Sequence, residues 1–74
     1  MPMLLSTVRK GSRVRIAGLP LGDMRSQLIR LGLMEGTVVE CLERLPGGTL
    51  VLLHSRQEVA VSTELAASIT VSSL

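Results

Sequence analysis

Few side chains in this chain of 74 residues could do chemistry. His54 is its only histidine and Cys41 its only cysteine. Nucleophilic catalysis needs a nucleophile, a base and a group that orients the base, and one imidazole leaves little to build such a site around. The serines and threonines fall mostly where turns, helix caps and solvent-facing strand positions need them. We therefore expect a protein that is not an enzyme.

Cys41 and His54 are the candidate metal ligands. A closed zinc site takes about four Cys or His ligands, and this chain has one of each. Counting outward from an expected turn at residues 47–48, Cys41 lies opposite a position near His54. A carboxylate such as Glu43 or Glu58 could add a third ligand, two chains could share an ion, and the pair could then make a metal-responsive regulator. The more ordinary expectation is a buried thiol, an exposed imidazole and neither metal nor cofactor.

Other common binding motifs are missing. A phosphate-binding loop needs several glycines before a Lys-Thr or Lys-Ser pair, or a strand-linked Gly-x-Gly-x-x-Gly, and neither occurs. The chain has no Phe, Trp or Tyr. It therefore lacks the aromatic-lined groove that binds proline-rich peptides and the stacking platform that binds single-stranded nucleic acid.

The basic residues gather in the first half of the chain. Residues 1–34 hold six bases and one acid, whereas residues 35–74 hold two bases and five acids. The first half could bind an acidic partner, unless neighbouring strands interleave the two halves and cancel the field. Four residues form a candidate basic patch for the phosphates of structured RNA or DNA: Arg9, Lys10, Arg13 and Arg15. The net charge of +2 is too small to identify a nucleic-acid-binding protein, so this partner is the alternative.

A strand and a helix are predicted in the first half. Residues 13–17 alternate bases with apolar residues, as in a half-buried strand. An apolar stripe predicts an α-helix over about residues 23–31. The stripe consists of Leu21, Met24, Leu28 and Leu31. Asp23 would cap this helix or favour its dipole, and Gly32 supplies the left-handed residue that ends it. Ile29 falls outside the stripe.

The second half predicts strands joined by tight turns. They cover residues 37–45, 49–54, 57–61 and 69–71. Ser55-Arg56 is short enough for a two-residue turn, although it lacks the usual Gly or Asn. Ser62 or Thr63 caps a short helical turn near residues 63–67. The expected fold is mainly β: a small closed barrel of five strands with one inserted helix, as a single domain over residues 1–74.

Short motifs in a fixed order carry a family resemblance. They are Gly11-x-x-Val14-x-Ile16, the segment 28–39 (LxxLGLMEGTVV), Pro46-Gly47-Gly48, the segment 58–61 (EVAV) and Ala66-Ala67-x-Ile69-x-Val71. Together they cover nearly the whole chain and resemble the FeoA family of ferrous iron transport proteins. The resemblance implies an SH3-like barrel. It also implies a noncatalytic cytosolic accessory protein of bacterial ferrous iron uptake, which binds and regulates the membrane GTPase permease FeoB.

The helix and the turn after it are the expected docking surface. Ile29 stands where the family commonly has a polar residue, and Glu35 where it often has Pro. If Ile29 is exposed, it forms with Arg25 a mixed apolar and basic patch suited to a protein partner; if the barrel rim covers it, it is additional core. The candidate partner-binding residues are Arg25, Ile29, Arg30, Leu33, Met34 and Glu35. Self-association is a further alternative.

The sequence predicts neither secretion nor membrane insertion. Residues 1–5 have no basic lead and too few consecutive apolar residues for a signal peptide. The longest uncharged apolar-rich segment, residues 65–74, is half the ~20 residues that a membrane helix needs. A single cysteine forms no internal disulfide, so a cytoplasmic protein is expected.

Overall fold

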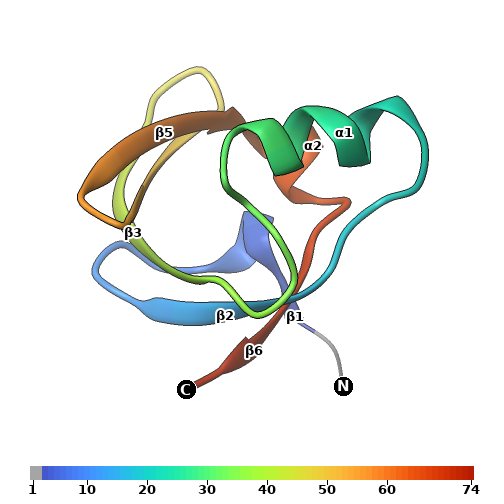
Figure 1. Cartoon of the computed structure of the whole chain (residues 1–74). Coiled ribbons are helices and arrows are strands. Elements are labelled where there is room, and N and C mark those ends of the chain that lie inside the picture. Colours follow the sequence, from blue (N-terminus) through green and yellow to red (C-terminus); the bar gives the residue numbers. More distant parts are fainter. Residues whose placement is uncertain (1–2) are drawn as a thin grey trace.

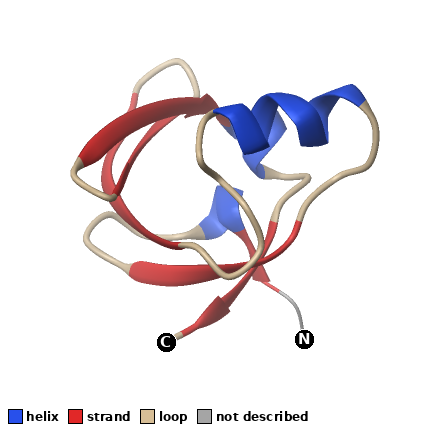
Figure 2. Ribbon diagram, in the orientation of Figure 1, coloured by secondary structure: helices blue, strands red, loops and turns tan. Residues whose placement is uncertain are grey.

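The computed structural model describes residues 3–74, which form one antiparallel sheet with three short helical segments (Figures 1 and 2). The strands are β1 Met3–Leu4, β2 Arg13–Gly18, β3 Val38–Leu45, β4 Thr49–His54, β5 Gln57–Ser62 and β6 Thr70–Ser73. The helical segments are the 3-10 helix η1 Leu5–Thr7 and the α-helices α1 Asp23–Arg30 and α2 Thr63–Ala66. None of these described helices is long and apolar enough to cross a bilayer.

The sheet curls into a small barrel, and its spatial order is β1-β6-β2-β3-β4-β5. The mainly β fold with one inserted helix and a helical turn near residue 63 is confirmed, and the barrel is SH3-like. Two details differ from expectation. The described chain has a sixth strand, because β1 pairs with β6 through Met3↔Val71 and Leu4↔Thr70. The end strands β1 and β5 do not pair with each other; α2 contacts both η1 and β5 and links the two ends of the sheet.

Buried and exposed residues alternate along the strands, and the buried side chains fill the barrel. In β2, Val14 and Ile16 are buried while Arg13 and Arg15 are exposed, as the sequence pattern predicts. The same period of two continues in β4, whose alternate residues point into the interior. The core is aliphatic and contains Leu5, Val8, Val14, Ile16, Leu28, Leu33, Val39, Cys41, Leu50, Leu52, Val61, Ala66, Ile69 and Val71. Since no aromatic ring is available, many small contacts must replace a few large ones.

The helix α1 buries less of its surface than the apolar stripe predicts. Within the helix only Leu28 is buried. Leu21 lies before the helix and is 87% exposed, and Met24 and Leu31 are also exposed. The predicted helix is confirmed, but three of the four stripe members stay exposed, because this eight-residue helix contacts the core through a single position. Asp23 is not the N-cap: Gly22 occupies that position, and Asp23 lies in the first turn, where its charge favours the helix dipole.

The short helix α2 is capped as the sequence predicts. The Ser62 Oγ accepts a hydrogen bond of 3.1 Å from the backbone N–H of Leu65. Ser62 has the extended backbone typical of an N-cap residue. The cap fixes the point at which the chain leaves β5 and turns into α2.

The turn between β4 and β5 holds two non-glycine residues in the left-handed region. Ser55 has φ 47° and Arg56 has φ 65°. Both φ values fit the type I′ turn that suits a two-residue hairpin, for which Asn-Gly is the favoured pair. The expected hairpin is therefore present, at a cost in backbone strain.

Relief of this strain should stabilise the protein. We expect the double substitution Ser55→Asn with Arg56→Gly to raise the free energy of unfolding by about 0.5–1 kcal/mol, because Asn and Gly adopt positive φ more readily. Urea unfolding followed by circular dichroism measures the change. Arg56→Ala is the matched control, since it removes the same side chain and keeps the strain; an equal gain in this control would contradict the explanation.

Candidate protein-docking site

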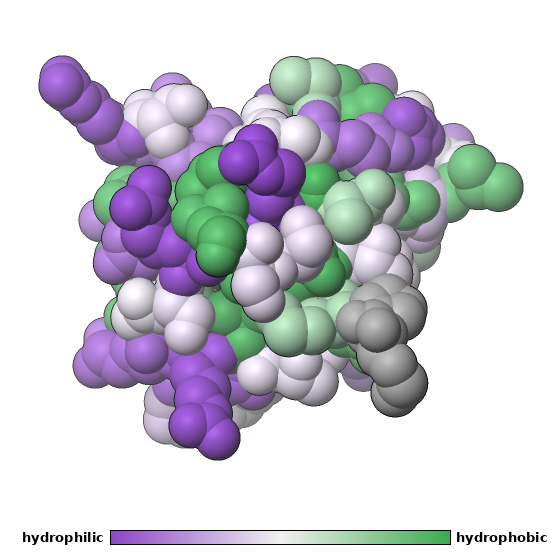
Figure 3. Space-filling model, turned by 90° about the horizontal axis from the view of Figure 1, so that it is seen from below, coloured by the Kyte–Doolittle hydropathy of each residue, from purple (hydrophilic) through white to green (hydrophobic). Residues whose placement is uncertain are grey.

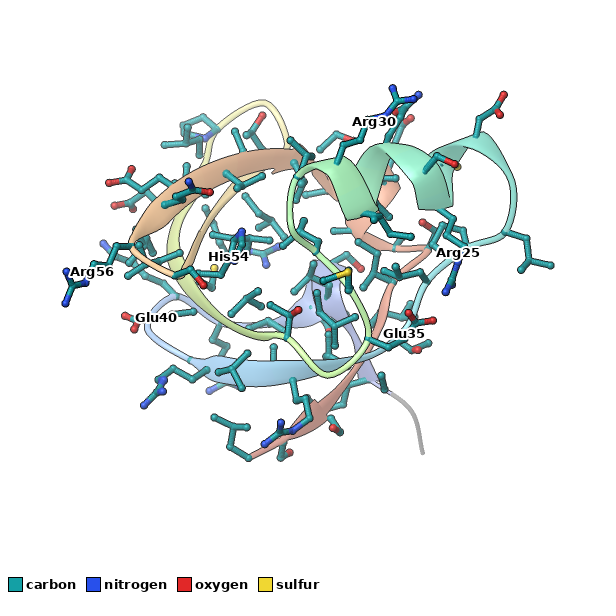
Figure 4. The ribbon with its side chains drawn as sticks, in the orientation of Figure 1. Arg25, Arg30, Glu35, Glu40, His54 and Arg56 are labelled. Atoms are coloured by element: carbon teal, nitrogen blue, oxygen red, sulfur yellow. The ribbon has the colours of Figure 1, made fainter. Side chains whose placement is uncertain are left out.

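An ion pair joins α1 to the loop that follows it. The Arg25 guanidinium donates two hydrogen bonds to the Glu35 carboxylate, with Nη1 to Oε2 at 2.8 Å and Nη2 to Oε1 at 3.1 Å. The two side chains point toward one another across the gap between helix and loop (Figure 4). The hydrogen bond from Arg25 lowers the pKa of the Glu35 carboxyl, and the same bond raises the pKa of Arg25. The pair is partly exposed, so it orients the loop more than it stabilises the fold.

Exposed apolar side chains concentrate around α1. Of the nine large hydrophobic residues that are exposed among residues 3–74, five lie between residues 21 and 34. These five are Leu21, Met24, Ile29, Leu31 and Met34. Ile29 is 39% exposed and Met34 is 47% exposed, so Ile29 belongs to the surface and not to the core. Arg30 is exposed on the same helix and points away from the barrel (Figure 4).

Leu33 does not belong to this surface. It is 0% exposed and is part of the core, so the expectation that it contacts a partner is wrong. The reason is the way in which α1 ends. The Gly32 N–H donates to the Ile29 carbonyl at 2.9 Å and the Leu33 N–H donates to the Leu28 carbonyl at 2.9 Å. This is a Schellman motif, which turns the chain so that Leu33 and Leu28 both enter the core.

His54 supports the end of α1 from inside the barrel. Its Nε2 lies 3.0 Å from the Leu31 carbonyl oxygen, and the imidazole lies within the curve of the sheet (Figure 4). Because a carbonyl only accepts, Nε2 carries the proton in this bond. Gly32 packs against the same ring: a Cβ on Gly32, which has φ +86°, would lie 2.5 Å from the His54 Cε1. The imidazole is buried, so the expectation of an exposed imidazole is wrong.

Cys41 and His54 have separate surroundings. Cys41 is buried and pairs in register with Leu52, two residues before His54. Its Sγ lies 3.7 Å from the Glu43 carbonyl oxygen, and burial raises the pKa of the thiol. Within residues 3–74, no group of three or more His, Cys, Asp or Glu residues is arranged to hold a metal ion. Residues 50, 52 and 54 alternate on one face of β4, and this pattern is the sequence signal for burial of His54.

Three of the four residues of the basic patch lie close to acids or carbonyls of the second half. Lys10 Nζ is 3.2 Å from Glu43 Oε1, and Arg13 pairs in register with Glu40. Arg15 Nη1 donates to the Gly36 carbonyl at 3.3 Å. Strand pairing therefore interleaves the two halves and disperses the positive charge. Figure 3, which views the molecule from the side of β2 and β6, shows hydrophilic and hydrophobic residues interspersed on this face.

The comparisons with known proteins agree with this geometry. Residues 3–73 of the chain match the FeoA domain family. The chain belongs to the FeoA family. No curated protein sequence matches the chain.

Solved structures share the fold over almost the whole chain. An iron uptake regulatory protein, FeoA, has a TM-score of 0.88 at 24% identity, covering 100% of this chain and 99% of that one. The FeoA protein from Chlorobium tepidum has a TM-score of 0.89 at 26% identity, covering 97% of this chain and 70% of that one. A manganese-dependent transcriptional repressor has a TM-score of 0.89 at 21% identity, covering 99% of this chain and only 42% of the repressor. The FeoA fold thus occurs both alone and as part of a larger regulator.

The contact between Gly32 and His54 yields a prediction about stability. Gly32→Ala should lower the free energy of unfolding by the cost of a left-handed alanine, about 1–2 kcal/mol, and by a further amount for the clash with the imidazole. Gly11→Ala is the matched control, because Gly11 has φ +88° and nothing within 4 Å of its added Cβ. Thermal unfolding of both variants measures the difference. Equal losses in the two variants would show that the ring does not constrain Gly32.

The ion pair yields a prediction about pH. The pKa of Glu35 is lower in the folded protein, so its stabilisation is present above the unfolded pKa, about 4.3, and is lost as the pH falls through the folded value. We expect Glu35→Gln to be less stable than the parent near pH 7 and equally stable at low pH. Urea unfolding between pH about 7 and about 3 measures this. Glu58→Gln removes a carboxylate that has no ion-pair partner among residues 3–74 and is the control. A difference for Glu35→Gln that persists unchanged at low pH would contradict the assignment.

Proposed function

We propose that this protein is a noncatalytic accessory protein of ferrous iron uptake. In this proposal it acts in the cytoplasm, where it binds the cytosolic part of a FeoB-like permease and regulates it. Its membership of the FeoA family supports the link to ferrous iron transport. So does its likeness, over its full length, to a protein described as an iron uptake regulatory protein.

The positions of the reactive side chains support a noncatalytic role. The imidazole of His54 is engaged by the Leu31 carbonyl and packs against Gly32. The thiol of Cys41 lies in the core, and its raised pKa keeps it protonated, which disfavours nucleophilic attack. Both side chains therefore have structural roles, and in this proposal residues of the outer surface carry the function.

The concentration of exposed apolar residues around α1 carries the docking proposal. Soluble proteins rarely expose such residues together, and a mixed apolar and charged surface is typical of a protein interface. Ile29, Met34 and Arg30 give this surface apolar anchors beside a charge. The Arg25–Glu35 pair fixes the loop that carries Met34 relative to the helix that carries Ile29. The partner thus meets a surface that is already ordered before binding, which reduces the entropy lost on association.

Substitution of Ile29 tests this surface. The purified protein is titrated with the cytosolic domain of a FeoB-like permease by calorimetry, and Ile29→Ser should weaken binding by about tenfold, because it removes a central apolar anchor. Leu45→Ser is the matched control: Leu45 is 44% exposed, close to the 39% of Ile29, but lies at the β3–β4 hairpin. This variant should bind as the parent does.

Two results would overturn the proposal in different ways. Equal binding by Ile29→Ser and the parent would remove α1 from the interface. No binding by the parent protein at any accessible concentration would remove the permease as the direct partner.

A further inference from the structure

A cavity of about 300 Å³ lies away from α1, where the segment before β2 meets β2 itself and the end of β6. Its lining residues are Met3, Thr7, Val8, Arg9, Ser12, Arg13, Val14 and Ser73. None of them belongs to the docking surface around α1. The lining combines two guanidiniums and three hydroxyls with three apolar side chains, and it contains no carboxylate.

The two arginines of this cavity have guanidiniums that no ion pair or side-chain hydrogen bond engages among residues 3–74. Arg9 and Arg13 are both exposed; Glu40 lies opposite Arg13 on β3, but no ion pair joins the two side chains. By contrast, Lys10 pairs with Glu43 and Arg25 pairs with Glu35. A guanidinium with free donors favours an oxyanion, to which it can donate two parallel hydrogen bonds. Two such groups beside one cavity provide the charge that an anionic ligand needs.

The backbone that carries these groups is fixed. Arg44 Nη1 donates to the carbonyl oxygens of Ser6, at 3.0 Å, and Val8, at 2.8 Å. The Ser12 N–H donates to the Arg9 carbonyl at 3.0 Å, which closes the turn between the two arginines. The ligand would therefore meet a wall that is already formed, which limits the ordering cost of binding.

The hydroxyls and the apolar residues of the cavity define the rest of the ligand. The side chains of Ser12 and Ser73 make no hydrogen bond within the described chain and can donate to an oxyanion. Thr7 is already engaged, because its Oγ1 donates to the Leu4 carbonyl at 2.8 Å. The exposed side chain of Met3 provides apolar surface against which a short hydrocarbon group can lie, whereas Val8 and Val14 are buried in the core behind the cavity. A volume of about 300 Å³ is at the lower end of the range for small-molecule sites.

We propose that this cavity binds a small organic oxyanion, in which a phosphate or carboxylate group contacts Arg9 and Arg13 and a short apolar group contacts Met3. A long polyanion fits less well, because the neighbouring bases Lys10 and Arg15 are engaged by Glu43 and by the Gly36 carbonyl. The site is independent of permease binding, so each proposal can fail without the other.

Titration of the whole protein with three probes tests the site and its ligand class. The probes are inorganic phosphate, butyl phosphate and hexanoate, and backbone amide shifts in nuclear magnetic resonance spectra report binding. We expect saturable shifts confined to residues around the cavity for at least one organic probe, and weaker binding of inorganic phosphate, because it lacks the apolar group. Tighter binding of butyl phosphate assigns a phosphate ester as the ligand, and tighter binding of hexanoate assigns a carboxylate.

Substitutions separate a built site from general charge attraction. Arg9→Gln and Arg13→Gln should each weaken binding by about threefold to tenfold, the range for loss of one charged contact at a partly exposed site. Arg30→Gln is the matched control, because Arg30 is exposed and does not line this cavity. Met3→Gln should weaken binding of the organic probes and leave inorganic phosphate unchanged.

Three results would overturn the proposal. The first is the absence of saturable shifts for all three probes. The second is an equal effect of Arg30→Gln and Arg9→Gln, which would indicate charge attraction alone. The third is shifts that centre on α1 instead of the cavity.

Discussion

The contact of the His54 imidazole with the end of α1 determines where the helix sits on the barrel. His54 is the last residue of β4, and the chain has no Phe, Tyr or Trp that could fill the same space. Its Nε2 holds the Leu31 carbonyl, one of the carbonyls that a helix end leaves without an internal partner. Only a residue without a side chain can follow Leu31 at this distance from the ring, and Gly32 meets this requirement. The strand and the helix end therefore specify each other.

The proposed docking surface follows from this arrangement. Once Gly32 turns the chain, Leu33 enters the core and the chain leaves again at Met34. Glu35 is then placed opposite Arg25, and the two side chains join the loop to the helix. An exposed ion pair of this kind contributes little to stability. Its effect is geometric, because it joins the loop that carries Met34 to the helix that carries Ile29 and limits the positions that the loop can take.

The strands were predictable because each has a local pattern that the tertiary structure does not oppose. The alternation in residues 13–16 and the turn residues at 47–48 and 55–56 act within a few residues, and they locate β2, β3, β4 and β5. The strand β1 has only two residues, too few for any periodicity, and it exists because β6 offers it a partner. The helix illustrates the opposite case. Its apolar stripe is real, but the number of stripe residues that become buried depends on how closely the helix approaches the barrel. The contact of His54 with the end of α1 limits this approach.

The candidate site was predictable in part for the same reason. Ile29 stands out in the sequence because it lies about 100° from Leu28 around the helix axis, and its exposure then follows from the burial of Leu28. Leu33 lies only five residues after Leu28, and periodicity alone could not assign it to the core, because the Schellman motif interrupts the helical period. The alternation along β4 indicates that His54 is buried. Its hydrogen-bond partner Leu31, however, lies 23 residues away, and no local pattern connects the two residues.

The barrel fold does not by itself determine what the protein does. The same fold occurs in a small FeoA protein of nearly equal length and as under half of a manganese-dependent repressor. A shared core of aliphatic residues explains this, since a core specifies the fold and leaves the outer residues free to change. Our proposals rest on features that the core does not require: the exposed Ile29 and Met34, the pairing of Arg25 with Glu35, and the unpaired Arg9 and Arg13 among the described residues. These are surface features, and for this reason both of our proposals concern recognition of other molecules.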